Sequence, residues 1–368
     1  GSPRARPLEG SPGYPPADLV VLRAMSALGL DAAADLVVPR PGSRAQSDNF
    51  GGCAAHRHAS GPENRKIGGR ASGIASDPGR RCHAEGVIAA VVDRATRAYW
   101  RLTGRRVDPA GADAWLSAPI HGHSQVGDDW IADAAAELGG RTVTGPDQGL
   151  LPDLAALDGP GFRAADLHPS VRDFYQATAG WRMDVWTQWS APFRPLGAVV
   201  TGLFGRRVQQ LALPTRPLDT ARGMDSRVVA VLDADGRQRF AAWLRTLRAT
   251  GEYVYSGCYT TTLLPGTDQP SVHVSFPLEQ GNVQVFLRPA VLPGGALLLS
   301  SPPGRFGGDG AYVLVRHGPV HHAARVPLHE EFRVFVDDEG VLRTDHVLRL
   351  WSATVLRLHY RMARIAPG

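Results

Sequence analysis

The spacing of hydrophobic residues changes near Arg182, from a helical repeat to the alternation of polar and apolar positions that is typical of strands. Turn sequences such as DADG (233–236) and DDEG (337–340) separate most of the alternating segments. A dozen such segments in succession predict a meandering antiparallel sheet. They are RMDVWTQW (182–189), GAVVTGLF (197–204), RRVQQLAL (206–213), SRVVAVLD (226–233), RQRFAAWLRTL (237–247), EYVYSGCYTTT (252–262), SVHVSFPL (271–278), NVQVFLRP (282–289), GALLLSS (295–301), AYVLVRHG (311–318), EFRVFVDD (331–338) and VLRTDHVLRLW (341–351).

Three segments before Arg182 have helical periodicity instead. Residues 85–102 place apolar side chains on one stripe of a helix. Residues 128–140 begin with aspartates and end at Gly139, and residues 168–180 have a proline near the first turn. We therefore expect three amphipathic helices ahead of the sheet.

The rest of the amino-terminal region changes in composition. Residues 1–16 are rich in proline and glycine and are expected to be a disordered tail, followed by a short helix within 17–38. Residues 39–84 lose all periodicity and predict a disordered linker. The predicted organisation is completed by a helical segment, 85–181, and an antiparallel β-barrel-like domain, 182–368.

The fold class that follows is α+β, with amino-terminal helices ahead of a large antiparallel barrel or half-barrel. So many strands rarely stay flat and open, because strand twist makes a large sheet curl or split. In number and order of strands the chain resembles a lipocalin-type container, although no family motif covers it.

Composition narrows the class of protein. The chain has 368 residues, of which 43% are hydrophobic, so it can bury a substantial core. The formal charge is +5, Lys66 is the only lysine, and the arginines alternate with acids instead of clustering. We expect no nucleic-acid partner, and we interpret the arginine bias as a property of a GC-rich, bacterial genome.

Cysteine content and hydropathy bear on location. Cys53, Cys82 and Cys258 show no metal-binding spacing, and whether Cys53 pairs with Cys82 stays open. We find no signal peptide and no apolar run long enough to span a bilayer, which predicts a reduced, cytoplasmic protein. Nothing in the sequence decides the oligomeric state.

The segment EYVYSGCYTTT predicts a ligand pocket. Strand alternation would place Tyr253, Tyr255 and Tyr259 on one face, with Gly257 leaving space between them. Tyrosine combines a rigid apolar body with a polar tip, which suits a wall that holds a small molecule. The alternative is ordinary cross-strand packing of tyrosines.

Two further segments contribute polar groups to the predicted pocket. In SVHVSF, His273 lies on the face opposite the valines, and in NVQVFL the residues Gln284 and Phe286 share a face. We predict that these three side chains join the tyrosines in binding the ligand.

Catalysis on a bound ligand is the second hypothesis. His273 is the first candidate for proton transfer because an imidazole titrates near neutral pH, and Asp225 is the second-choice base. Tyr255 or Tyr259 would donate a hydrogen bond to a substrate oxygen. The histidines near residue 320 lack the fixed spacing of metal ligands, so no metal and no cofactor are expected.

The sequence thus favours a protein that binds a mostly apolar molecule, such as a lipid or polyketide, inside a barrel. An enzyme that acts on this molecule by acid/base chemistry (cyclisation, isomerisation or hydrolysis) is the alternative. A non-catalytic scaffold for protein contacts is the third possibility.

Overall fold

The computed structural model describes most of the chain from residue 94 onward. The described residues are 94–122, 127–193, 223–248, 251 and 253–365. Outside them lie the predicted tail, first helix and linker, with Cys53 and Cys82, and the predicted strands 197–204 and 206–213.

The described residues form one network of antiparallel strands, which confirms the predicted antiparallel sheet. The 14 strands are β1 (Arg105–Val107), β2 (Arg141–Val143), β3 (Trp181–Trp189), β4 (Met224–Leu232), β5 (Gln238–Leu247), β6 (Tyr253–Thr262), β7 (Ser271–Leu278), β8 (Gly281–Leu292), β9 (Ala296–Ser300), β10 (Gly310–His317), β11 (Val320–Val326), β12 (Leu328–Val336), β13 (Leu342–Leu350) and β14 (Ala353–Arg364). Their hydrogen-bonded order is β2-β4-β5-β6-β7-β8-β9-β12-β13-β14-β3, and β10 and β11 extend from β8 to β1.

Strand alternation located most of this sheet correctly. Each predicted segment that lies within the described residues coincides with a strand, from β3 to β10 and at β12 and β13. The prediction missed β11, β14 and the short strands β1 and β2. β11 carries His321 and His322, and the turn that precedes it is at Gly318, whose φ is +57°.

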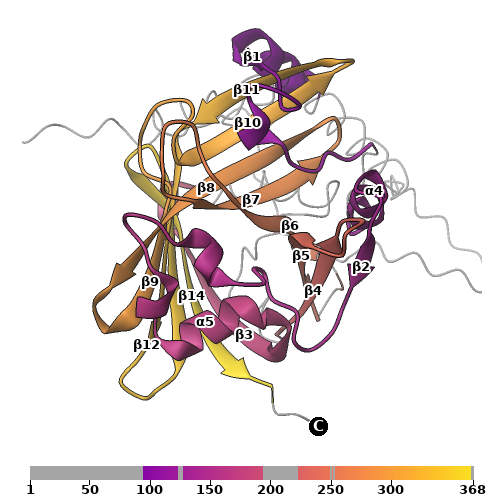
Figure 1. Ribbon diagram of the computed structural model, residues 1–368. Helices are drawn as coiled ribbons and strands as arrows, with labels where there is room; N and C mark the ends of the chain where they lie inside the picture. Colours follow the sequence, from indigo (N-terminus) through magenta and orange to yellow (C-terminus); the bar gives the residue numbers. More distant parts are fainter. Residues whose placement is uncertain (1–93, 123–126, 194–222, 249–250, 252, 366–368) are drawn as a thin grey trace, which may run out of the picture.

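The sheet bends strongly, but its strands within the described residues do not close into a barrel. Figure 1 shows β7, β8 and β10 in one wall and β9, β12, β14 and β3 in another. The strands at the two ends of the path, β2 and β3, do not pair in the described part of the chain. β3 contacts β4 without forming a ladder of hydrogen bonds.

The helices within the described residues are short, and none is long and apolar enough to cross a membrane. Residues 94–103 are helical, α4 (Trp130–Glu137) is followed closely by Gly139 with φ +59°, and α5 (Pro169–Gln176) starts at its proline. The 3-10 turns are η1 (Ala114–Leu116), η2 (Leu154–Leu157), η3 (Ala164–Asp166), η4 (Thr178–Gly180), η5 (Ala191–Phe193) and η8 (Pro293–Gly295).

One face of the sheet, which we call the outer face, is covered by α4 and by residues 107–121. Trp130 of α4 packs with Leu244 of β5 and Cys258 of β6, and its indole N–H donates to Ser256 Oγ at 3.0 Å. Trp115 and Leu116 cover β8 and β10 in the same way.

The other face, the inner face, carries the largest buried cluster, which includes Trp243, Tyr259 and Leu299. The segment between β2 and β3 packs against it through Leu150, Phe174 and neighbouring residues. Figure 1 shows α5 of this segment in front of the wall that contains β12, β14 and β3. Part of the inner face is therefore filled by the chain itself.

Candidate functional site

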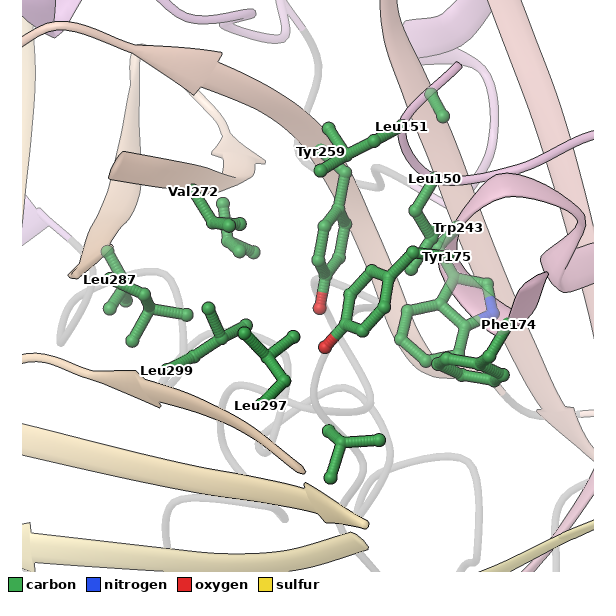
Figure 2. Close-up of a cluster of buried hydrophobic side chains, with 14 of the residues drawn as sticks. Leu150, Leu151, Phe174, Tyr175, Trp243, Tyr259, Val272, Leu287, Leu297 and Leu299 are labelled. Carbon is green, nitrogen blue, oxygen red and sulfur yellow. The ribbon is translucent and has the colours of Figure 1, made fainter. Parts of the chain in front are cut away.

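Tyr255 and Tyr259 share one face of β6, as strand alternation predicted, and this face is the inner one. Their rings are 6.3 Å apart, and Trp243 of β5 packs against both, at 5.4 and 5.6 Å. In Figure 2 the hydroxyls of Tyr259 and of Tyr175 in α5 point toward one another. Burial raises the pKa of both tyrosines of β6, and the carboxyl group of Glu330 raises them further.

Tyr253 does not share this face, which corrects the prediction. Arg245 of β5 pairs with Tyr255 and the next residue, Thr246, pairs with Tyr253, so Val254 is the extra residue of a β-bulge in β6. The bulge interrupts the alternation, and Tyr253 packs against the cluster under α4.

Gly257 does not leave space for a guest either. A Cβ atom placed there would lie 2.9 Å from the Cε1 and Oη atoms of Tyr255. The Tyr255 ring thus folds over Gly257 and fills the predicted gap.

His273, Gln284 and Phe286 lie on the outer face, on the other side of the sheet from Tyr255 and Tyr259. β7 pairs Val274 with Tyr259, so the valine face is the inner one and the histidine face is not. His273 stacks on Phe286 with ring centres 4.3 Å apart, and Trp115 packs beside them.

The polar groups around His273 satisfy one another. The His273 ring contacts Gln284 Oε1 at 2.9 Å and Thr262 Oγ1 at 3.1 Å. The Gln284 amide donates to Asn282 Oδ1 at 2.8 Å and to the Leu116 carbonyl at 2.9 Å. Burial lowers the pKa of His273 to about 4, so the ring is neutral at neutral pH. A satisfied buried network of this kind fastens residues 116–119 to the sheet.

Asp225 is also outside the inner face. It is exposed, and its carboxylate makes an ion pair with Arg248 at 2.7 Å on the surface. Neither His273 nor Asp225 is positioned to act on a molecule bound beside Tyr259.

The inner face instead carries a polar group that sequence reasoning did not assemble. Arg245 of β5 is 6% exposed, and its guanidinium carbon lies 5.1 to 5.9 Å from the ring centres of Trp243, Tyr255 and Tyr360. It makes no ion pair with any described residue, and its one hydrogen bond is to Met224 Sδ at 3.9 Å.

Glu330 of β12 and His346 of β13 are the other two polar residues near Arg245 on the inner face. Desolvation raises the pKa of Glu330 to about 7, although the side chain retains partial exposure. His346 stacks on Phe332 at 3.8 Å. Burial, and to a smaller extent the charge of Arg245, lower the pKa of His346 to about 3.

Several polar atoms in this region are buried without a hydrogen-bond partner of good geometry. They are Arg245 Nε, the Tyr255 hydroxyl and both ring nitrogens of His346. Buried polar atoms are nearly always paired, so such a concentration on one face needs an explanation. Ser275 Oγ on the outer face also has no hydrogen-bond partner of good geometry. The atoms of the inner face differ because they surround a buried charge, and we therefore take the inner face as the candidate site.

The inward direction of Glu330 and His346 could have been predicted from the alternation of side chains along their strands. Glu330 alternates in phase with Phe332 and Val334, and Val334 is in the buried cluster. His346 is likewise in phase with Leu342 and Leu350. A charged or polar residue that shares the parity of the apolar positions is directed at the core. As the alternation implied, Asp345 lies on the opposite face from His346 and contacts His359 Nδ1 at 2.7 Å.

The part of the chain that the structure describes offers neither a metal site nor a reactive cysteine. No group of three or more His, Cys, Asp or Glu side chains there is placed to hold a metal. Burial raises the pKa of the Cys258 thiol to about 12, which disfavours the reactive thiolate.

Comparison of the chain with protein-family models, with curated proteins and with solved structures gives no match.

Proposed function

We propose that the protein binds a mostly apolar small molecule on the inner face of the sheet, within a half-barrel formed by the two walls. The observation that carries the proposal is the set of unpartnered polar atoms on Arg245, Tyr255 and His346 in otherwise apolar surroundings. Ligand sites commonly combine an apolar lining with a few polar groups that fix orientation.

Partial exposure of inward-facing residues also supports this proposal. Val283, Val313 and Ala324 are paired across β8, β10 and β11 and face the buried cluster, yet each retains some solvent exposure. Apolar side chains in this state provide contact area that a bound molecule would cover.

The test is native mass spectrometry of the protein purified from cells, with and without a bulky inner-face substitution. Ala324→Trp should displace a co-purifying ligand, because the indole occupies the space beside Val313. Ala363→Trp is the matched control, since Ala363 is exposed on β14. Equal ligand content in both variants and the wild type would contradict an inner-face site, as would the absence of any ligand together with no binding of added apolar probes.

Acid/base catalysis on the bound molecule is a second candidate, favoured by Glu330. A carboxyl group with a pKa of about 7 can both donate and accept a proton at neutral pH. In this version Glu330 takes the role that the sequence assigned to His273 and Asp225, and Tyr255 or Tyr259 would donate a hydrogen bond to a substrate oxygen.

The test compares Glu330→Gln with Glu331→Gln, a neighbour that is ion-paired with Arg349 at 3.6 Å. If Glu330 transfers a proton, conversion should fall by about 100-fold or more. The Glu330→Gln protein would then carry an unconverted ligand with a different mass or isomeric form. Identical ligands on both variants and on the wild type would contradict catalysis by Glu330, and the protein would then only bind the molecule.

A further inference from the structure

Arg245 is an unusual residue for the inner face of a sheet. Its charge is buried, and the described residues supply no carboxylate in ion-pair contact with it. Burying an unpaired charge is costly unless another group compensates it. The three aromatic rings around the guanidinium compensate only part of this cost, because cation–π contacts are weaker than a charge-assisted hydrogen bond.

The groups beside Arg245 are suited to donate hydrogen bonds. The Tyr255 hydroxyl interacts with Tyr259 but has no hydrogen-bond partner of good geometry. The neutral His346 ring, which has none either, carries one N–H. Glu330 is near enough to influence the tyrosines, but it makes no ion pair with Arg245. Besides Glu330, whose pKa of about 7 leaves it partly protonated at neutral pH, the site thus offers one positive charge and two neutral donors.

We infer that the inner face binds a molecule with an apolar body and a single carboxylate, and that Arg245 is the residue that anchors this carboxylate. The inference rests on the proposed function and specifies its ligand class. A guanidinium matches a carboxylate in shape, since its N–H groups can meet both oxygens. One negative charge neutralises Arg245, whereas a doubly charged phosphate would leave an excess of buried charge.

The apolar body of the ligand follows from the remaining surroundings. Leu297, Leu299, Val272 and Leu287 line the inner face opposite Tyr259 in Figure 2. Leu358 of β14 belongs to a second apolar cluster, which also contains Tyr360 beside Arg245. Arg245 therefore lies between two apolar regions, so that a carboxylate held there can have its hydrocarbon part in either one.

The experiment measures binding of decanoate and of decan-1-ol, which has the same chain without the charge, by titration calorimetry at neutral pH. The wild type should prefer decanoate. Arg245→Met should weaken decanoate binding by about 30-fold, the equivalent of about 2 kcal/mol, and leave decan-1-ol binding unchanged or stronger. Arg357→Met is the control, because Arg357 is exposed on β14.

The outcomes separate the inference from the proposed function. If the wild type binds both molecules equally well and Arg245→Met weakens neither interaction, Arg245 does not bind a carboxylate. The proposed function, binding of an apolar molecule on the inner face, would still hold. If the wild type binds neither molecule, the proposed function fails and the inference with it. Arg245→Gln is a second variant should Arg245→Met not fold, and loss of the preference for decanoate in Arg245→Gln supports the inference equally.

Discussion

The network around His273 permits a sharp test of whether this histidine is structural. Gln284→Met is the chosen perturbation, because methionine has nearly the same shape as glutamine but can neither accept from His273 nor donate to the Leu116 carbonyl. The wild-type contacts are 2.9 Å each, and both are buried.

The expected loss follows from the groups left without partners. Each buried polar group that loses its hydrogen bond costs about 1–3 kcal/mol, and Gln284→Met affects three of them: His273 Nε2, the Leu116 oxygen and Asn282 Oδ1. We expect a loss of about 3 kcal/mol in the free energy of unfolding. A domain of this size loses about 2–4 °C per kcal/mol, so the melting temperature should fall by roughly 6–12 °C.

Urea denaturation and thermal melting of the full chain provide the assay, in a double-mutant cycle with His273→Leu. Each single variant leaves the other side chain without its hydrogen-bond partner. The double variant should therefore be less destabilised, by about 1 kcal/mol, than the sum of the two single variants. Gln188→Met, at an exposed position of β3, should change stability by less than about 0.5 kcal/mol. If Gln284→Met is as mild as this control, or if the two changes are additive, the network does not hold the segment. Decanoate binding by folded Gln284→Met should equal that of the wild type, because the network faces away from Arg245.

Three further predictions test other parts of the structure. Glu330 keeps its proton up to a pKa of about 7 in the folded state against 4.5 when unfolded, so the native state loses stability as pH rises through this window. Urea denaturation should show Glu330→Gln gaining up to about 3 kcal/mol relative to the wild type across the window; a pH-independent difference would refute this. Trp130→Phe removes the 3.0 Å hydrogen bond to Ser256 and should lower the free energy of unfolding by about 2 kcal/mol. The control Trp186→Phe, at a position that is 54% exposed, should lower it by less than about 0.5 kcal/mol. Similar losses in the two variants would contradict the role of this hydrogen bond in holding α4 on the sheet. Gly257→Ala should cost about 1–3 kcal/mol by displacing the Tyr255 ring and much less in a Tyr255→Ala background; equal costs in the two backgrounds would show that the ring is not the obstacle.

Local pattern by itself determined the strands and the grouping of residues within each strand. Alternation is a property of one segment, since successive side chains of a strand point to opposite faces. It therefore located β7 and β8, and it separated Val274 from His273 and Val285 from Gln284 correctly. Local signals also located α4 and α5, whose ends are marked by Gly139 and Pro169.

Only the tertiary structure decided which face of each strand, the valine face or the polar face, points inward. β7 is buried on both faces, with α5 and its neighbours on one side and residues 107–121 on the other. A polar face in a buried strand has the same sequence pattern whether it lines a pocket or pairs with a distant segment. Hence His273 and Gln284 were predicted on the same face as Tyr255 and Tyr259, whereas they lie on the opposite face.

The candidate site depended on tertiary structure in a second way. Arg245, Tyr255, Glu330 and His346 come from β5, β6, β12 and β13, and only the tertiary structure brings them to one region. The bulge beside Arg245 also moved Tyr253 to the outer face, because one extra residue reverses the direction of the side chains that follow. Strand parity shows that a polar residue points inward, but the partner it lacks becomes evident only when every neighbouring strand is in place.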